Sequence, residues 1–574
     1  MDIKSQLKKS LDLIIKEISG QDAIFVLEVP EDPVHGDYST NAAMVLAKPL
    51  AKSPRAIAEQ IKLEVEKQKW EVLDRVEIAG PGFVNFFISQ NTLGKLLQEI
   101  EDKKDTFGNN STLSGTKVIT EFTDPNPFKE FHIGHLYSNG VGEAISRLIE
   151  SQGAEVKRVC YQGDIGLHVA KALYGIMNNE LGIKEIEDAP IDEKAKYLGK
   201  AYAFGATKYE EDELAKKEII EINKKVFAKD PEVYEIYTQG KSWSLEYFET
   251  IYARLGTKFD NYFFESEVGE DGKKLVLGYL EKGVFRESEG AVIFPGEEYG
   301  LHNRVFINSL GLPTYEAKEL GLAPAKYEYF PYDQSIVITG NEINAYFKVL
   351  LKALSLIRPE LAEKTLHISH GMVRLPEGKM SSRTGKILTG EWLLDEAKKR
   401  VIEKMNESDP EISDAETIAE KIAVAAVKYA LLKSGIGGDI AFSFDESISF
   451  EGNSGPYLQY TYVRTQGILG KSNSLTVNKW KMEDGKWKME IEEEALLRHL
   501  IHFPEIVSYA AATHSPNHVC EYLYQLAQKF NLFYAKHKIV GSDREPLRLV
   551  LTQSVGQVLQ NGLTLLGIPV VEKM

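Results

Sequence analysis

The stretch from residue 118 to residue 161 constrains the fold most, because a strand, a helix and a second strand follow one another in it. Residues 118–122 form a short strand pattern, which the sequence Asp124-Pro125-Asn126-Pro127 ends, since proline cannot continue a strand ladder. Five apolar residues then recur at the spacing of one helical face: Val141, Ala144, Ile145, Leu148 and Ile149. Residues 156–161 read as the next strand. This order predicts a parallel α/β sheet, whose ligands bind in the crevice at the carboxyl ends of its strands.

A His-x-Gly-His turn, Phe131-His132-Ile133-Gly134-His135, lies at that crevice, between the first strand and the helix. The first turn of a helix offers free N–H groups and a positive dipole end, so it suits phosphate. His132 and His135 add donors, and Gly134 lets a nucleotide approach the backbone closely. The alternative is a pair of ordinary surface histidines at a turn. Gly163 and Asp164 follow the second strand and fall at the same edge of the sheet.

A second motif, rich in lysine and serine, occurs far downstream as Gly378-Lys379-Met380-Ser381-Ser382-Arg383. A lysine with neighbouring hydroxyls suits the charge that develops on phosphorus and on pyrophosphate, and such contacts accelerate a reaction only if they strengthen in the transition state. Gly378 and Gly385 flank the motif and would allow a loop to close. Taken alone, the motif is more typical of a solvated basic loop.

In this order and in these settings, the two motifs resemble the ATP signatures of class I aminoacyl-tRNA synthetases. The surrounding sequence resembles, more narrowly, the arginyl-tRNA synthetase family. Five stretches carry that resemblance, which covers nearly the whole chain: residues 32–38, 81–86, 121–129, 455–460 and 565–574.

The resemblance implies a multidomain α/β fold. We expect an N-terminal α+β tRNA-binding domain over residues 1–105 and a Rossmann-like parallel-sheet catalytic domain over residues 106–400. A polar, helix-rich stretch at about residues 178–290 reads as an insertion into that domain. Residues 401–574 are expected to form an all-α helical bundle that binds the anticodon, and the apolar spacing from Ala415 onward is helical.

The resemblance also implies roles for individual residues. The catalytic residues would be His132, His135, Lys379 and Lys129. The ATP-binding residues would be Gly134, Gly163, Asp164, Met372, Met380, Ser381 and Ser382. The arginine-binding residues would be Glu121, Asn126, Tyr315, Glu319 and Glu342. Contacts with tRNA would come from Asn85, Tyr460 and Arg464. The arginine set makes chemical sense, because a guanidinium is always charged and only donates hydrogen bonds, so its pocket needs carboxylates. Glu319 and Glu342 could instead be solvated carboxylates on helices, and the tyrosines near Tyr460 could be core residues.

Several residues depart from the family pattern. Ser382 stands where the second signature usually has its second lysine, and Lys129 matches an upstream lysine thought to compensate for that loss. Tyr137 replaces a frequent arginine, Ile165 a tryptophan and His168 a glutamine. The residues Gly340-Asn341-Glu342-Ile343 replace the usual Gly-Ala-Asp-His. These departures count more against assigning the family's roles to single residues of this chain than against assigning the family's reaction to the chain.

Composition adds few limits. The formal charge of −17 argues against a non-specific nucleic-acid binder, but local basic faces can still bind one folded RNA. Only Cys160 and Cys520 are present, which argues against a disulfide framework or a cysteine zinc site and fits the cytoplasm. No stretch is apolar for long enough to span a membrane. We expect a monomer with no structural metal, whose magnesium arrives with ATP.

The resemblance therefore implies an arginine–tRNA ligase whose partners are ATP, L-arginine and tRNA(Arg). Two alternatives stay open. One is another class I synthetase or nucleotidyltransferase with the same ATP motifs. The other is a synthetase-like RNA-binding protein that has lost catalysis.

Overall fold

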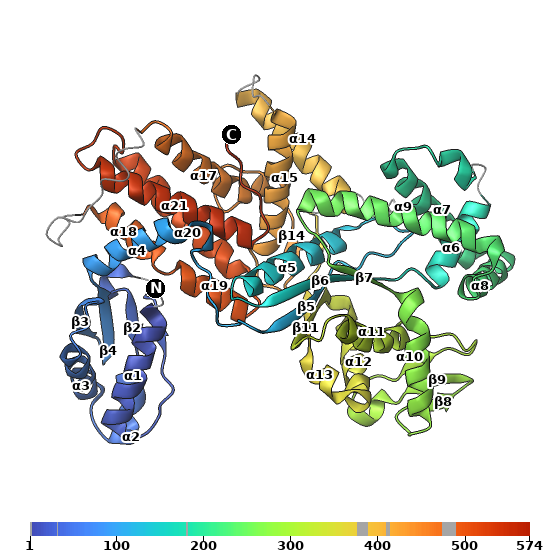
Figure 1. Cartoon of the computed structure of the whole chain (residues 1–574), viewed down its shortest axis with the longest axis horizontal. Coiled ribbons are helices and arrows are strands. Elements are labelled where there is room, and N and C mark those ends of the chain that lie inside the picture. Colours follow the sequence, from blue (N-terminus) through green and yellow to red (C-terminus); the bar gives the residue numbers. More distant parts are fainter. Residues whose placement is uncertain (1–2, 31, 179–181, 376–388, 409–413, 473–488) are drawn as a thin grey trace.

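The computed structural model describes residues 3–30, 32–178, 182–375, 389–408, 414–472 and 489–574. It is a multidomain α/β protein with a central parallel sheet, a C-terminal helical part beside that sheet, and an N-terminal part with an antiparallel sheet that packs on the C-terminal helices (Figure 1). None of the helices in these ranges has the length and apolar character needed to cross a bilayer.

The N-terminal part is a four-stranded antiparallel sheet of order β1-β2-β4-β3 packed on helices. The first helix has Leu7, Leu11 and Ile14 on its buried face. Ser53 and Ser89 start α3 and α4 because each side chain accepts a hydrogen bond from the first helical turn. The elements are α1 (Ile3–Ser19), β1 (Leu27–Glu28), η1 (Pro33–His35), β2 (Tyr38–Thr40), α2 (Ala42–Leu50), α3 (Pro54–Lys67), β3 (Leu73–Ala79), β4 (Phe83–Ile88), α4 (Gln90–Lys103) and η2 (Lys104–Thr106).

The central part is built on a five-stranded parallel sheet of order β12-β11-β5-β6-β7. Its strands are β5 (Lys117–Glu121), β6 (Glu155–Gln162), β7 (Asn261–Phe264), β11 (Gln334–Gly340) and β12 (Thr365–His370). The predicted strand–helix–strand unit is β5, α5 (Ile133–Glu150) and β6. The chain proceeds from β5 toward β7 on one side and returns through β11 on the other, so the strand order reverses between β5 and β11. A doubly wound sheet binds its ligands at this position.

Both faces of the sheet are covered, which explains why its strands are apolar on both sides. On one face, Val118 and Ile336 pack with α5, and α5 in turn lies against the C-terminal helices. On the other face, Ile119 and Val337 pack with α10 (Glu265–Leu280), α11 (Tyr315–Tyr329) and α12 (Asn344–Ile357). Neighbouring residues of each strand thus alternate between two cores.

The stretch between β6 and β7 is helical, as predicted, and has a core of its own. It comprises α6 (Leu167–Met177), η3 (Ile183–Ile186), α7 (Ile191–Glu211), α8 (Glu213–Phe227) and α9 (Pro231–Leu255). The structure differs from the expected insertion at 178–290 in one respect, because β7 lies within that range and yet pairs with β6 in the central sheet. A strand of four residues after a long polar helical stretch gives too short an apolar run to be recognised.

A small antiparallel sheet precedes α11. Its elements are β8 (Arg286–Ser288), β9 (Ala291–Phe294), η4 (Gly296–Tyr299) and β10 (Arg304–Ile307). The connections after β11 and α12 are η5 (Asn341–Ile343) and α13 (Pro359–Lys364).

The C-terminal part is helical, as expected. Its elements are α14 (Gly390–Ser408), α15 (Ala415–Leu432), α16 (Phe444–Ser447), α17 (Gly455–Leu469), α18 (Ile491–Leu500), α19 (Phe503–Ala512), α20 (Asn517–Lys536) and α21 (Glu545–Leu565). A two-stranded parallel ladder, β13 (Val373–Arg374) with β14 (Ile440–Ala441), connects it to the central part. The predicted boundary at 400/401 falls inside α14, and the domain boundaries remain predictions.

Candidate active site

Two histidines cap the N-terminus of α5. The His132 Nδ1 accepts hydrogen bonds from the backbone N–H groups of Gly134 (3.1 Å) and His135 (3.3 Å), and the His135 Nδ1 accepts one from the backbone N–H of His132 (3.2 Å). The two rings stack with their centroids 3.4 Å apart. Each ring therefore satisfies backbone donors that the first turn of a helix otherwise leaves without partners.

This reciprocal cap fixes the proton on each ring. Because each Nδ1 accepts, the proton of a neutral imidazole must lie on Nε2, which is left as a donor. Burial, and then the charge of Lys129, lowers the pKa of His132 below its ordinary value, and burial, His132 and Lys129 lower that of His135 well below it. Both rings are thus neutral donors at the positive end of α5.

The loop between β5 and α5 has a strained backbone. Thr123, Asp124 and Phe128 have φ values of 80°, 46° and 66°, in the left-handed region that side chains disfavour. Hydrogen bonds hold the first two residues: the Ser138 hydroxyl accepts from the Thr123 N–H (2.9 Å), and Asp124 accepts from the Tyr161 N–H (2.7 Å). Strain that the surroundings enforce is typical of functional sites.

A cavity of about 440 Å³ opens beside this loop, at the carboxyl ends of β5 and β11. His132, Gly134, His135 and Met372, all predicted to bind ATP or act on it, line this nucleotide cavity. Its wall also includes His370, which sequence reasoning missed although Met372, two residues further along the chain, was predicted to bind ATP.

The predicted Lys379, Met380, Ser381 and Ser382 lie outside the described residues. The described residues on either side of that segment are tied to the nucleotide cavity. Met372 and Val373 line it, and on the other side Thr389 pairs with His132 while the Gly390 N–H donates to the Phe131 carbonyl (2.7 Å).

A second cavity, of about 460 Å³, adjoins the first. All five residues predicted to bind arginine line it: Glu121, Asn126, Tyr315, Glu319 and Glu342. The two cavities share five wall residues: Asp124, Asn126, Thr339, Glu342 and Ile343. A ligand in one can therefore touch a ligand in the other.

The second cavity has an excess of carboxylates. Six line it: Glu121, Asp124, Glu265, Glu316, Glu319 and Glu342. Three of them are held in ion pairs with cations of this chain, namely Lys326–Glu121 (2.6 Å), Lys318–Glu265 (2.6 Å) and Arg304–Glu316 (2.9 Å). In the described ranges of the chain, the other three have no ion pair. This lining is chemically suited to a cation, and we call the cavity the acidic cavity.

Burial, and then repulsion between carboxylates, raises the pKa of three of these groups. Desolvation, and then the charge of Glu121, raises the pKa of Asp124 and of Glu319 well above the ordinary values. Burial raises the pKa of Glu265 to about 7 although Lys318 opposes the shift. A cation that enters the cavity would relieve this repulsion.

Glu265 is a wall residue that sequence reasoning missed. It follows β7 directly as the first residue of α10, so the strand that was not recognised carries it into the cavity. A carboxylate immediately after the apolar run Tyr262-Phe263-Phe264 is the signal that could have identified it.

Of the predicted residues Gly163, Asp164 and Lys129, only Gly163 lines one of the two cavities. Gly163 lines the acidic cavity rather than the nucleotide cavity, and a Cβ there would come within 2.3 Å of the Asn126 Oδ1. Asp164 lines neither cavity; it is fully buried and accepts hydrogen bonds from Tyr237, Lys241 and Ser266.

Lys129 also lines neither cavity. Its Nζ lies 4.9 Å from the centroid of the Tyr202 ring, and burial, with Lys171, lowers its pKa.

The predicted tRNA contacts fall on two surfaces. Asn85 is 3% exposed and accepts a hydrogen bond from Ser39 (2.7 Å), a burial that does not favour contact with RNA. On α17, the Arg464 guanidinium lies over the rings of Tyr460 (4.8 Å) and Tyr534 (4.9 Å), both of which are partly exposed. Stacked tyrosine and arginine groups of this kind can accept unpaired bases.

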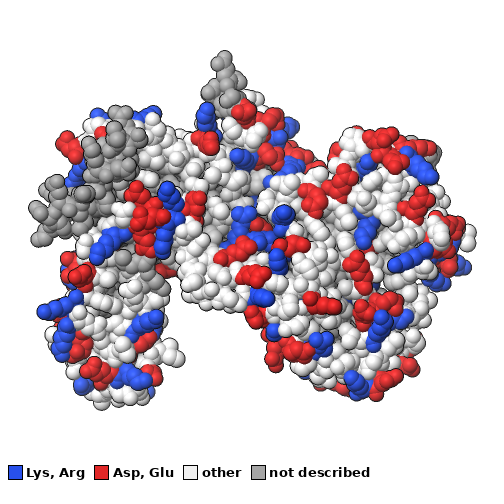
Figure 2. Space-filling view, viewed as in Figure 1, with Lys and Arg blue, Asp and Glu red and all other residues white. Residues whose placement is uncertain are grey.

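Tyr534, on α20, also lines a basic cavity with Lys471, Lys536, His537 and Lys538. The surface drawn in Figure 2 otherwise mixes acidic and basic groups, so the overall negative charge does not exclude a local basic site.

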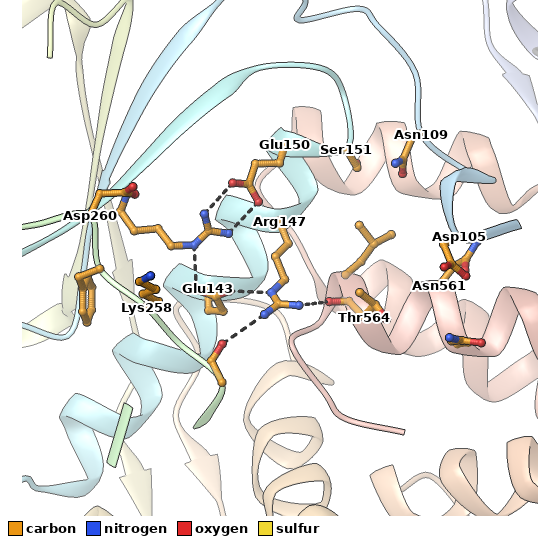
Figure 3. A pocket seen from close by; sticks show the side chains of 15 residues that line it. Asp105, Asn109, Glu143, Arg147, Glu150, Ser151, Lys258, Asp260, Asn561 and Thr564 are labelled. Atoms are coloured by element: carbon orange, nitrogen blue, oxygen red, sulfur yellow. Dashed lines mark hydrogen bonds and ion pairs between the residues drawn. The ribbon is translucent and has the colours of Figure 1, made fainter. Parts of the chain in front are cut away.

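A larger cavity, of about 890 Å³, lies at the opposite end of α5, between that helix and α21 (Figure 3). Arg147 spans it and donates to Glu143 (2.6 Å) and to the carbonyls of Thr564 (3.0 Å) and Gly256 (3.3 Å). Its arginines are thus engaged by partners within the chain, and none of the predicted site residues lines it. We regard it as a joint between α5 and the C-terminal helices.

The chain is similar to known proteins over nearly its whole length. Residues 1–88 match the family described as arginyl tRNA synthetase N terminal domain, residues 97–444 match tRNA synthetases class I (R), catalytic domain, and residues 458–574 match the DALR anticodon binding domain.

Full-length relatives agree with these matches. The chain is 32% identical over 562 residues to the arginine–tRNA ligase of Treponema denticola, which covers 96% of this chain and 94% of that protein. It is 33% identical over 549 residues to that of Fusobacterium nucleatum, with 94% and 93% covered. The solved arginyl-tRNA synthetase of Thermus thermophilus is similar with a TM-score of 0.81 and 25% identity, over 100% of both chains.

Proposed function

This chain belongs to the arginyl-tRNA synthetases of class I, so it ligates arginine to tRNA with the use of ATP, and we propose that ATP and arginine meet in the two adjoining cavities at the head of α5. One observation carries the proposal. A cavity with three carboxylates that no cation of the described chain holds shares its wall with a cavity lined by two neutral histidines at a helix N-terminus. The first suits a guanidinium, and the second suits phosphates.

In this arrangement, Glu319 and Tyr315 bind the guanidinium. Glu121 holds the α-ammonium, and Asn126 holds the backbone end of the amino acid at the shared wall. Glu342 lies at the same wall and completes the acidic set.

The nucleotide cavity then receives ATP. His132 and His135 donate to its phosphates through Nε2, Gly134 allows the close approach, and Met372 contacts the nucleotide. Gly163 forms part of the wall on the arginine side. Asp164, buried next to it, holds this turn in place through its hydrogen bonds to Tyr237, Lys241 and Ser266.

The reaction follows from this placement. The arginine carboxylate attacks the α-phosphorus in line, the bond to the bridging oxygen breaks, and pyrophosphate leaves. Positioning and charge stabilisation are the protein's contribution. Lys379, assisted by Met380, Ser381 and Ser382, and Lys129 are proposed to stabilise the leaving pyrophosphate, and magnesium arrives with the ATP.

The activated arginyl group passes to a 3′-terminal ribose hydroxyl of tRNA. The DALR anticodon-binding domain implies tRNA(Arg) as the partner. We propose that Tyr460 and Arg464, with Tyr534, contact the anticodon loop, and that the Asn85 region contacts tRNA elsewhere. We further propose a monomer in the cytoplasm, a compartment that two buried free cysteines support.

ATP–pyrophosphate exchange over a panel of the twenty amino acids, with and without total tRNA, tests the proposed function. Among the twenty amino acids, we expect only arginine to give exchange. Labelled arginine should also be transferred to tRNA by the same preparation. Exchange with another amino acid would indicate a different specificity. No exchange and no charging under either condition would indicate that catalysis has been lost.

A further inference from the structure

His168 lies between two residues of the acidic cavity without lining it. It belongs to the first turn of α6 and is 8% exposed. Its Nε2 lies 2.7 Å from the carbonyl oxygen of Gly163, and its Nδ1 lies 3.3 Å from the hydroxyl of Tyr315. Both partners line the acidic cavity. The ring thus connects the end of β6 to the start of α11 behind the cavity wall.

The chemistry of these partners fixes the direction of both hydrogen bonds. A carbonyl oxygen only accepts, so the Nε2 of His168 must carry the proton. In a neutral imidazole the Nδ1 is then bare and accepts a hydrogen bond. The Tyr315 hydroxyl must therefore donate its only proton to His168, and what its oxygen presents to the cavity is lone pairs.

Charges around the ring favour the neutral form that this direction requires. Burial, and then the charges of Lys129 and Lys318, lower the pKa of His168 and outweigh the opposite effects of the Gly163 carbonyl and Asp164. Lys318 itself is held by Glu265 (2.6 Å) and by the carbonyl of Ile165 (3.1 Å), so it does not compete for the bare Nδ1. A tyrosine oxygen that can only accept is complementary to a guanidinium, which can only donate.

We propose that His168 is a positioning residue for substrate selection, which holds the Tyr315 hydroxyl as an obligate acceptor and so favours arginine over a neutral side chain of the same shape. This inference rests on the proposed placement of arginine in the acidic cavity. L-Citrulline is the probe, because its ureido group replaces one nitrogen of the guanidinium by a carbonyl oxygen. That oxygen would face the lone pairs of Tyr315 and be repelled.

The variants His168→Leu and His168→Gln separate the hydrogen-bonding role from mere packing. An amide can donate to the Gly163 carbonyl and accept from Tyr315, so glutamine is expected to keep arginine kinetics within about twofold of the wild type. Leucine frees the tyrosine hydroxyl to rotate. We expect kcat/KM for arginine to fall about tenfold through KM. The inhibition constant of citrulline should fall relative to the arginine KM, while the KM for ATP stays unchanged.

A double-mutant cycle with Tyr315→Phe completes the test. If His168 acts through the tyrosine hydroxyl, His168→Leu has no further effect once that hydroxyl is gone. Three results would overturn the inference: additive losses in the cycle, glutamine as damaging as leucine, or a parallel loss for arginine and citrulline. Glu319→Gln in the same assay reports on the pocket itself. If that variant binds arginine normally, the placement of arginine fails, whereas a loss there with a silent His168→Leu removes only the role of His168.

Discussion

Replacing Glu319 with glutamine is expected to lower kcat/KM for arginine about 10²- to 10³-fold, because a bound guanidinium loses its charge partner in a poorly solvated cavity. Glutamine keeps the size of the side chain, so the loss reports the charge. It should appear mainly in the KM for arginine, while the KM for ATP, which binds in the neighbouring cavity, stays close to that of the wild type. Aminoacylation rates at varied arginine and at varied ATP measure both constants.

The pH dependence gives the same variant a second readout. Desolvation and Glu121 raise the pKa of Glu319 in the empty cavity, and a guanidinium favours the ionised form, so arginine binding must release protons. The KM for arginine should therefore fall as the pH rises, and glutamine should weaken that dependence. Glu328→Gln is the matched control, since Glu328 lies exposed on the same helix. An arginine KM equal to that of the control would exclude Glu319 from the pocket.

Replacing His132 with asparagine is expected to slow ATP–pyrophosphate exchange about 10²- to 10³-fold, because the Nε2 donor to the phosphates is lost. Asparagine is a strong N-cap, so α5 should still begin at Ile133 and the thermal unfolding temperature should stay close to that of the wild type. The variant therefore separates the catalytic role of the ring from its capping role.

His132→Ala removes both roles and serves as the comparison. We expect the same loss of exchange and, in addition, a loss of about 1 kcal/mol in the free energy of unfolding. Calorimetry and exchange assays on the three proteins measure the two effects independently. Nearly full exchange in His132→Asn would show that the ring acts only as a helix cap.

Local patterns were enough to predict the centre of the fold. The strand–turn–helix order around His132 predicted β5, α5 and β6, since each has a clear apolar period and proline or glycine at its ends. The pattern could not place β7, because pairing with β6 depends on residues about a hundred positions apart. The same limit hid the joint at Arg147, whose partners are carbonyls of distant helix ends.

The motifs and the resemblance identified part of the candidate site, although Lys129 and Asp164, named in the same way, line neither cavity. All five arginine-pocket predictions line one cavity, and His132 and His135 line the next. Glu265 was missed because its strand was missed, and the cation partners of the carboxylates, such as Lys326, cannot be seen in a linear pattern. His168 was noted only as a departure from the family, since its effect depends on a ring placed between two distant segments.

The most direct test is a crystal structure of the chain with a non-hydrolysable analogue of arginyl-adenylate. We expect the guanidinium within hydrogen-bond distance of Glu319 and Tyr315 and the phosphate beside His132 and His135. A guanidinium bound away from the acidic cavity, or an adenylate bound at the opposite end of α5, would contradict the placement of both substrates.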